Sequence, residues 1–247
     1  MATSTPEGLF TAVLAARPES PLVTWYDDTP GRAARVELSA RSLANWSAKA
    51  AGLVGDELGL GPGDRVGVEL VAHWVLPGLL AGCWTAGVEV VTLGGDERAT
   101  VDAAVVARGS GTVVDADEIF TLDPASPLLL GAADDAPGAP PGSRDLPTAL
   151  RPHPDRPGPA RAAVHDVALD GRTRADLAAA GVNAAADLGL TTDAGRLLWS
   201  GALSGDALVT ALLGPWAVLG SLVLVTGGAA ADRLAAIATT EGVDVVR

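Results

Sequence analysis

The sequence predicts an α/β fold in which parallel sheets are flanked by helices, and three observations support this class. The segment 39–91 alternates helix, strand, helix and strand patterns, the unit from which parallel sheets are built. An apolar run that suits a buried parallel strand recurs at Leu222–Val225. Of the 247 residues, 48% are hydrophobic and only 4% aromatic, so a sizeable core must consist of Ala, Val and Leu.

The first part of the chain has the patterns of a helix and a β-hairpin. Between Pro6 and Ala16, apolar residues recur at i, i+3 and i+4, which favours an amphipathic helix. Residues 22–26 are rich in β-formers, and residues 27–31 have the composition of a turn. Residues 35–38 are therefore expected to form the returning strand.

The helix–strand–helix–strand unit comes next. Ser39 is a suitable N-cap for a helix that extends to about Leu58. Gly59, Gly61 and Gly63 resemble part of a dinucleotide-binding fingerprint, but they follow a helix and precede a strand, so we interpret them as a turn. The expected elements that follow are a strand at 65–70, a helix at 73–86 and a strand at 88–93. Because one helix joins the two strands, we expect them to be adjacent and parallel.

After this unit the sequence predicts a helix from Arg98 to Arg108 and a third parallel strand at 112–114. Gly94-Gly95 is interpreted as a strand-to-helix turn, and contact with a phosphate is the alternative. Asp115 and Asp117 follow the third strand. These carboxylates could bind a metal, although no further ligands are evident at a suitable spacing.

A proline-rich stretch divides the chain. Ten of the 17 prolines lie between Pro124 and Pro159, and proline blocks the interior of helices and sheets. We therefore expect a first α/β lobe at 1–123, a loop or linker at 124–160, and a second α/β segment at 161–247 that packs with the first. One continuous parallel sheet system is expected, crossed by this loop.

The second segment repeats the strand and helix patterns, with expected strands at 162–164, 167–169, 196–199, 222–225 and 243–246 and expected helices at 173–188, 204–219 and 232–240. The uncharged run from Ala207 to Ala231 is long enough to span a bilayer. Pro215 and the Gly220-Ser221 pair interrupt it, and neither end has a basic cluster. We expect a helix and a buried strand instead, with Trp216 largely buried.

Charge and cysteine content narrow the function classes. With 17 basic and 30 acidic residues the net charge is -13, which argues against nucleic acid as a partner because phosphate binding depends on Lys and Arg. Cys83, the only cysteine, cannot form an internal disulfide and is expected to be a buried apolar residue. The start of the chain lacks the pattern of a secretory signal. We therefore expect a cytoplasmic protein without a membrane span.

The pattern from Thr24 to Val91, and above all Gly59-Leu60-Gly61-Pro62-Gly63-Asp64-Arg65-Val66, resembles the amino-terminal domain of adenylate-forming enzymes. This superfamily contains the acyl-CoA synthetases, the adenylation domains of peptide synthetases and the luciferases. Residues 188–198, 212–224 and 242–246 resemble later parts of the same domain. More narrowly, the chain is similar to short uncharacterised actinobacterial AMP-binding-like proteins. The resemblance implies a truncated form of this domain.

The motifs that the resemblance associates with chemistry are missing. Family members activate a carboxylate with ATP and Mg²⁺, and a Ser/Thr/Gly-rich loop ending in Pro-Lys-Gly holds the phosphates. The segment Val164–Thr173 contains no such loop, and Ser200–Gly205 replaces the expected aromatic-histidine motif. The magnesium-binding Thr-Glu motif, the ribose-binding aspartate and the lysine-bearing lid would lie beyond the last residue. We therefore expect no catalytic, cofactor-binding or metal-binding residues and no cofactor.

Other chemistries receive little support. Ser204 could be a nucleophile oriented by the His165-Asp166 pair, but sequence alone cannot place them together. Residues 201–205 do not have the spacing of a Gly-x-Ser-x-Gly elbow. His73 has no second ligand at metal spacing, so we interpret it as a capping or packing residue.

These observations favour a non-catalytic binding or regulatory protein descended from AMP-binding acyl-CoA synthetases. Its expected partners are another protein or further copies of the same chain. One alternative is an AMP-dependent ligase that activates a carboxylate with ATP and Mg²⁺ and is completed by another chain. A second alternative is a nucleotide-binding module without catalysis.

Overall fold

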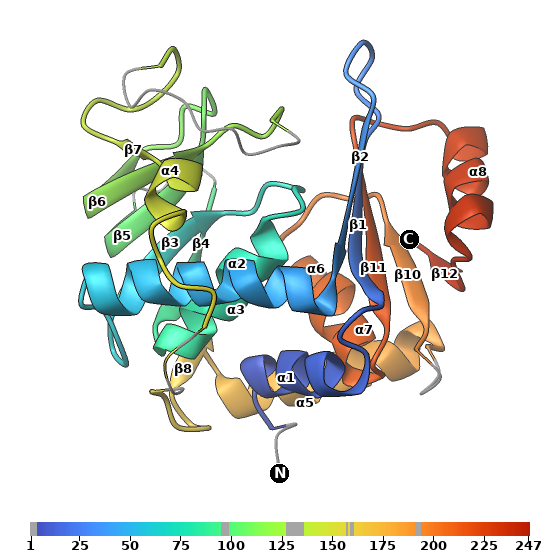
Figure 1. The fold of residues 1–247 in the computed structure, drawn as a ribbon, viewed down its shortest axis with the longest axis horizontal. Coiled ribbons are helices and arrows are strands. Elements are labelled where there is room, and N and C mark those ends of the chain that lie inside the picture. The colour runs from blue at the N-terminus through green and yellow to red at the C-terminus, as the bar shows by residue number, and fades with distance from the viewer. Residues whose placement is uncertain (1–3, 95–98, 127–135, 157, 159–160, 191–193) are drawn as a thin grey trace. The chain divides into compact units, whose positions relative to one another are not determined.

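The computed structural model describes residues 4–94, 99–126, 136–156, 158, 161–190 and 194–247 (Figure 1). The chain divides into two compact units, each assembled from separate stretches of sequence. The first unit comprises Met1–Ala44, Ala72–Pro77 and Arg174–Arg247, and the second comprises Asn45–Val71 and Gly78–Thr173. The division expected from the sequence, at 1–123, 124–160 and 161–247, follows chain order and stays a prediction.

The first unit contains a five-stranded sheet in the order β12-β10-β11-β1-β2. Its strands are β1 (Pro21–Asp27), β2 (Ala34–Ser39), β10 (Arg196–Trp199), β11 (Ser221–Thr226) and β12 (Val245–Val246). β1 pairs parallel with β11 and antiparallel with β2, which confirms the expected hairpin. β10 pairs parallel with both β11 and β12.

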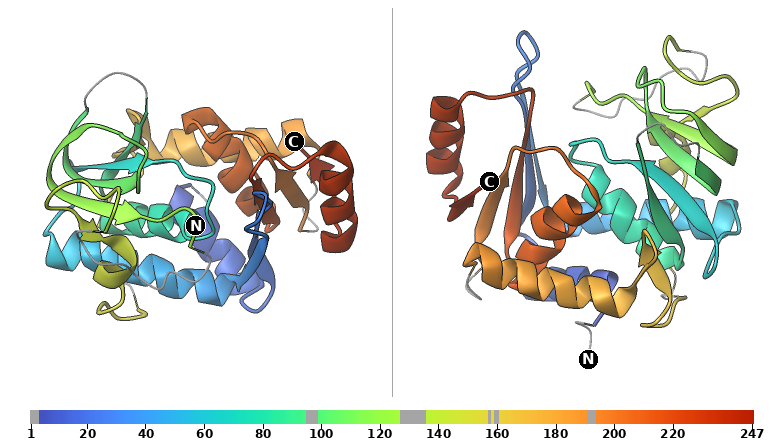
Figure 2. Two further views of the ribbon diagram at one scale, coloured as in Figure 1. Left: turned by 90° about the horizontal axis from the view of Figure 1, so that it is seen from above. Right: turned by 180° about the vertical axis from the view of Figure 1, so that it is seen from behind.

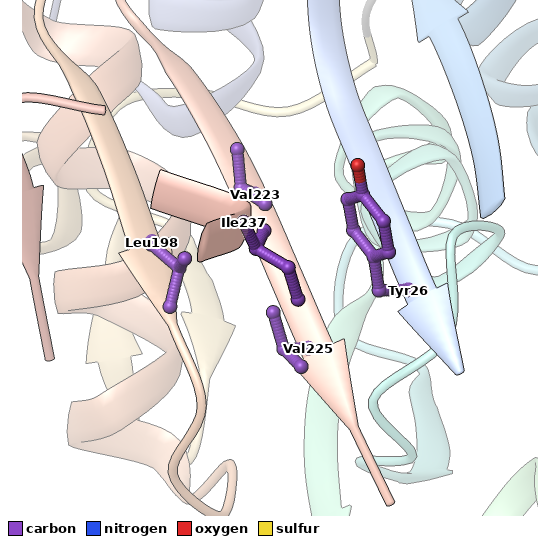
Figure 3. Close-up of a cluster of buried hydrophobic side chains, with 5 residues drawn as sticks. All are labelled: Tyr26, Leu198, Val223, Val225 and Ile237. Atoms are coloured by element: carbon purple, nitrogen blue, oxygen red, sulfur yellow. The ribbon is translucent and has the colours of Figure 1, made fainter. Parts of the chain in front are cut away.

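Helices cover both faces of this sheet (Figure 2). They are α1 (Pro6–Ala16), α5 (Arg174–Leu188), the continuous run α6 (Gly205–Leu208), η2 (Val209–Leu213) and α7 (Gly214–Ala217), and α8 (Ala231–Glu241). Ile237 of α8 packs against Tyr26, Leu198, Val223 and Val225, as Figure 3 shows. On the other face, the rings of Phe10 in α1 and Trp216 in α7 lie 5.1 Å apart.

The uncharged run from Ala207 to Ala231 forms the helical run and strand β11, as expected. Trp216 is 1% exposed, which confirms the prediction that it is buried. Within the described residues, no helix combines the length and the apolar character needed to cross a membrane.

The second unit contains a seven-stranded sheet in the order β7-β6-β5-β3-β4-β8-β9. The strands are β3 (Arg65–Glu69), β4 (Glu89–Leu93), β5 (Ala99–Ala107), β6 (Val114–Leu122), β7 (Arg144–Asp145), β8 (Val167–Leu169) and β9 (Arg172–Thr173). β3 and β4 are adjacent and parallel, as predicted, and α3 (Leu76–Ala86) connects them. Only β8 and β9 pair antiparallel among the described pairs of this sheet.

The helices of the second unit pack closely. α2 (Ala40–Gly52) continues into a π-helical turn, η1 (Leu53–Glu57). A Cβ on Gly82 of α3 would lie 2.5 Å from the Cβ of Ala50, so only glycine allows the two helices to come this close. Trp84 Nε1 donates to the Ala168 carbonyl at 3.0 Å and ties α3 to β8. The short helix α4 (Leu146–Leu150) inserts buried leucines beside β6 and β7.

Several expectations from the sequence are wrong. The strands form two separate sheets, not one continuous system. The segment predicted as a helix at 98–108 is strand β5, apart from Arg98, which lies outside the described residues. Intrinsic propensity favours a helix there because alanine is frequent, but β5 lies between β3 and β6, and its β-branched residues fit that buried position. Residues 162–164 form no strand, so β8 is the first strand of that region.

The overall class is nevertheless the predicted one, a mixed α/β fold with mostly parallel sheets flanked by helices.

Candidate functional site

Parallel α/β sheets bind ligands at the carboxyl ends of strands, where successive connections leave on opposite faces. In the first unit this position lies between β10 and β11. The chain leaves β10 into α6 on one face and leaves β11 toward α8 on the other face (Figure 2). The loops at residues 200–204 and 227–230 therefore define the candidate site of this unit.

Close backbone packing fills part of this edge. Gly227 has a φ of +91°, and a Cβ there would lie 2.2 Å from the backbone nitrogen of Thr29, so the position requires glycine. The Asp28 amide donates to the Thr226 carbonyl at 3.0 Å. The Asp28 carboxylate accepts from Arg233 Nε at 2.9 Å. These contacts hold the β1–β2 hairpin against the end of β11, so Asp28 has a structural role.

The polar residues that follow β10 also have local partners. Ser200 donates from its backbone amide and its hydroxyl to the Arg247 carbonyl, at 2.8 and 3.1 Å. The Ser204 hydroxyl accepts from the Ala207 amide at 3.4 Å and caps α6. A serine in this capping role has no base beside it to activate its hydroxyl within the described contacts.

His165 and Asp166, the proposed partners of Ser204, belong to the second unit. The His165 side chain is 82% exposed, and its Nε2 lies 3.9 Å from Asp166 Oδ1. Asp166 Oδ2 accepts from the Ala163 amide at 2.7 Å. The pair therefore forms a turn at the protein surface and not an ordered base.

The segment that the resemblance assigns to the phosphate loop is a short hairpin of β8 and β9. Its turn residue Asp170 has a φ of +47°. The Asp170 carboxylate accepts from the Thr92 amide at 2.8 Å and from the Thr92 hydroxyl at 3.0 Å. The Gly171 amide donates to Glu89 at 2.8 Å. This segment presents carboxylates bound to β4 where a phosphate loop would present amides and a lysine.

Gly94 follows β4 with a φ of +153°, whereas Gly95 lies outside the described residues. The next element is strand β5, so the interpretation of the pair as a strand-to-helix turn is wrong. The alternative that this glycine pair contacts a phosphate stays a prediction.

The predicted packing residues behave as expected. His73 is fully buried, its Nδ1 accepts from the Val75 amide at 3.3 Å, and its ring lies 4.8 Å from that of Trp25. Cys83 is also fully buried, and burial raises the pKa of its thiol to about 12. A thiol with this pKa is protonated at neutral pH and is neither a nucleophile nor a metal ligand.

The carboxylates considered as metal ligands have a different position from the one predicted. Asp115 and Asp117 do not follow a strand but lie within β6. With Asp102 and Arg65 they line a shallow cavity of about 370 Å³. Asp102 Oδ2 accepts from the Arg65 amide at 2.7 Å. Among the described residues, no group of three or more His, Cys, Asp or Glu side chains is arranged to hold a metal ion.

A second cavity, of about 190 Å³, lies at the amino ends of β1, β10 and β11. Arg17 and Gly242, the C-caps of α1 and α8, both line it. Helix C-termini carry partial negative charge, so this cavity is a poor place for a phosphate. Arg17 and Arg196 provide the compensating positive charge.

A polar network, in which only the Arg35 side chain is exposed (44%), joins α8 to the sheet of the first unit, and sequence reasoning did not identify it. Glu241 Oε1 accepts from the Tyr26 hydroxyl at 2.5 Å and from Arg35 Nε at 2.9 Å. Glu241 Oε2 accepts from Arg196 Nη2 at 2.8 Å. We call these four residues the Glu241 network. They come from β1, β2, β10 and α8, so no local sequence pattern could have shown their convergence.

The charges of the Glu241 network stabilise one another. Burial raises the pKa of the Glu241 carboxyl, but hydrogen bonds from Arg35 and Tyr26 and the charges of Arg35 and Arg196 hold it below its ordinary value overall. Burial, together with the hydrogen bond to Glu241, raises the pKa of Tyr26. Tyr26 therefore stays a neutral donor and Glu241 a charged acceptor, which suits a structural joint and not acid–base catalysis.

No family model matches the chain. A Mycobacterium tuberculosis protein described as a TIGR03089 family protein is 36% identical over a 229-residue alignment that covers 86% of each chain.

Solved structures that match this fold include an acyl-CoA synthetase and a CoA ligase. An acyl-CoA synthetase from Brucella canis matches with a TM-score of 0.70 and 18% identity, over 92% of this chain and 44% of that one. An anthranilate CoA ligase in complex with anthranoyl-AMP matches with a TM-score of 0.65 and 15% identity, over 96% of this chain and 46% of that one. The chain therefore has the fold of acyl-CoA synthetases and spans less than half of the length of these two.

Proposed function

We propose a function from one premise, that this chain belongs to the TIGR03089 family. In our proposal it is a non-catalytic binding or regulatory protein that has kept part of the fold of adenylate-forming enzymes. We further propose that it acts in the cytoplasm, together with a protein partner or as a homo-oligomer.

The observation that supports this proposal most directly is the β8–β9 hairpin. The segment at the place of the phosphate loop is bound to β4 through Asp170 and through the contact between Gly171 and Glu89. Triphosphate binding requires backbone amides and a cation directed at the phosphates. Here the Gly171 amide donates to the Glu89 carboxylate and the Asp170 amide to the Val90 carbonyl. The carboxylates of Glu89 and Asp170 would repel a triphosphate.

The position of the only lysine supports the same reading. Lys49 lies in α2, and its ammonium is bound by acceptors of the second unit. Removing one contact that stabilises the transition-state charge typically costs about a hundredfold or more in rate. Without a lysine at the β8–β9 segment, this chain alone should give little beyond the uncatalysed reaction.

The test is ATP–pyrophosphate exchange with the purified chain and a panel of fatty, aryl and amino acids. The expected result is exchange at background for every acid. Robust exchange with any one acid, lost when Ser200→Trp places a large side chain in the exposed loop at the carboxyl edge of the first sheet, would sink the proposal. The control is Arg41→Gln, because the Arg41 side chain is 61% exposed.

One observation favours a second candidate function, a ligase completed by another chain. The chain spans 44% to 46% of the two ligases compared above, so the remaining parts of such an enzyme could belong to a partner. Affinity purification from the native organism, followed by pyrophosphate exchange on the recovered complex, tests this. Exchange that appears in the complex and is absent from the chain alone would support this second candidate.

The remaining alternative is a nucleotide-binding module without catalysis. Thermal unfolding with and without ATP or AMP distinguishes it from a protein that binds no nucleotide. A ligand that binds only the folded state raises the melting temperature. If the chain binds no nucleotide, millimolar ATP or AMP should leave its melting temperature unchanged.

A further inference from the structure

The segment from Arg151 to Arg156 lies against helix α2 in the second unit, and we call it the latch. Only His153 of its six residues is partly buried, and the other five are exposed. The preceding helix α4 differs, because its Leu146 and Leu150 are buried. No apolar side chain anchors the latch, so polar contacts must hold it in place.

Lys49 of α2 provides the first set of contacts. Its Nζ lies 2.7 Å from the His153 carbonyl and 3.4 Å from the Arg151 carbonyl. The same Nζ lies 2.7 Å from Asp155 Oδ1. One ammonium group therefore reaches three acceptors, distributed over five consecutive residues of the latch.

His153 provides the second contact. Its Nε2 lies 3.0 Å from Glu57 Oε2, at the end of the π-helical turn η1. The ring lies over Gly52, where a Cβ would approach it to 3.0 Å, so a glycine in α2 allows the close contact. Arg144 Nη2 lies 2.8 Å from the other oxygen of Glu57 and keeps this carboxylate in position.

The identity of the residue at position 49 supports the importance of this contact. The chain has 17 basic residues, and Lys49 is the only one that is not arginine. An ammonium group has three donors on one compact atom, whereas a guanidinium is planar and presents its donors in a fixed fork. Three acceptors that converge on one point fit the ammonium and do not fit the fork.

We propose that the latch is a conformational device held closed by charge, with Lys49 as its central contact, and that removing the charge of Lys49 opens it over helix α2. Short segments with few buried apolar contacts open locally at low free-energy cost. The state of one amine therefore changes how often the Gly52 surface of α2 is uncovered.

Hydrogen exchange of the whole chain, measured by mass spectrometry, tests this. Pro152 and Pro154 have no amide hydrogen, and the His153 amide donates to the Leu150 carbonyl at 3.2 Å, so the amides of Arg151 and His153, whose carbonyls contact Lys49, report on the latch. We expect Lys49→Met to speed their exchange about fivefold, which corresponds to one surface ion pair of about 1 kcal/mol. We expect Lys49→Arg, which keeps the charge but not the compact ammonium, to give an exchange rate between those of Lys49→Met and the unchanged chain. The control Arg41→Gln should behave like the unchanged chain.

Exchange in Lys49→Met as slow as in the unchanged chain would overturn the proposal, and so would exchange in Lys49→Arg as fast as in Lys49→Met. If Lys49→Met fails to fold, hydrogen exchange of the unchanged chain at two salt concentrations is the test. Salt screens charges, so the amides of a latch held by charge must exchange faster at 1 M than at 0.05 M NaCl. No change with salt in that experiment would also overturn the proposal.

Chemical acetylation gives an independent readout, because Lys49 is the only lysine side chain. Acetic anhydride forms an amide bond with the amine as the anhydride C–O bond breaks, acetate leaves, and solvent takes the amine proton. Acetylation of Lys49 should speed exchange in the latch as much as Lys49→Met does. An acetylated chain with unchanged exchange would contradict the proposal.

Discussion

The Glu241 network of the first unit and the latch of the second unit use the same kinds of charged pairs in different environments. The side chains of Glu241 and Arg196 are 6% and 13% exposed. Those of Lys49 and Asp155 are 20% and 56% exposed. A charge removed from water must keep its partner, whereas water can replace the partner of an exposed charge. The comparison suggests that burial, and not the type of pair, decides whether such a contact is permanent or reversible.

The largest expected effect comes from Glu241→Gln. The change leaves the charge of Arg196, whose side chain is 13% exposed, without its carboxylate, and breaking a buried pair in this way costs about 3 kcal/mol. Urea unfolding monitored by tryptophan fluorescence measures the loss. Glu19→Gln, which breaks an exposed pair with Arg41, is the control and should cost under about 0.5 kcal/mol. Equal losses in the two variants would show that burial does not separate these pairs.

Double-mutant cycles sharpen the comparison. The Arg196–Glu241 cycle should give a coupling free energy of about 2 kcal/mol, within the range for residues that share a buried network. The Lys49–Asp155 cycle should give about 0.5 kcal/mol, as for exposed ion pairs. Both cycles are measured by urea unfolding at the same ionic strength. A larger coupling for the Lys49 pair would reverse our interpretation.

Acid should affect the Glu241 network in a defined direction. The pKa of Glu241 is lower in the folded protein than in the unfolded chain, so its contribution to stability is present above about pH 4.3 and is lost as pH falls through the folded value. The difference in unfolding free energy between the unchanged chain and Glu241→Gln should therefore shrink between pH 6 and pH 3. A difference that stays constant over this range would contradict the assignment.

The smallest expected effect is that of Glu57→Gln. Burial raises the pKa of Glu57, but hydrogen bonds and charges from Arg144 and His153 lower it overall. The Glu57 side chain is 35% exposed, so we expect a global destabilisation of about 0.5 kcal/mol. We also expect faster hydrogen exchange in the latch. A loss of unfolding free energy as large as that of Glu241→Gln would contradict the interpretation that the latch contacts are reversible.

Local patterns in the sequence predicted most elements well. Helix α1 has the bounds that periodicity and prolines indicate, Pro6–Ala16, and the parallel pair β3 and β4 follows from the helix between them. Strand β5 was missed because a central strand is determined by its neighbours in the sheet, and those come from distant parts of the chain. The separation into two sheets has the same cause.

The functional features were harder to predict for a similar reason. Tyr26 and Glu241 meet in space although 215 positions separate them in sequence. The proline content of residues 124–159 predicts little regular structure, and the described part of that stretch contains the short elements β7 and α4. It could not indicate that Lys49 holds part of that stretch, because a single lysine in a helix has no pattern.

The pairing of β1 with β11 has a consequence for synthesis of the protein. Val23 pairs with Leu222, so the ribosome must add roughly 200 residues, which takes about 10 to 40 s, before β1 meets its parallel partner. During that time the β1–β2 hairpin presents an unpaired strand edge that contains Trp25 and Tyr26. Such an edge is a template for association between nascent chains. The yield of this protein during expression should therefore depend on elongation rate and on chaperones that cover β1 until β11 has been made.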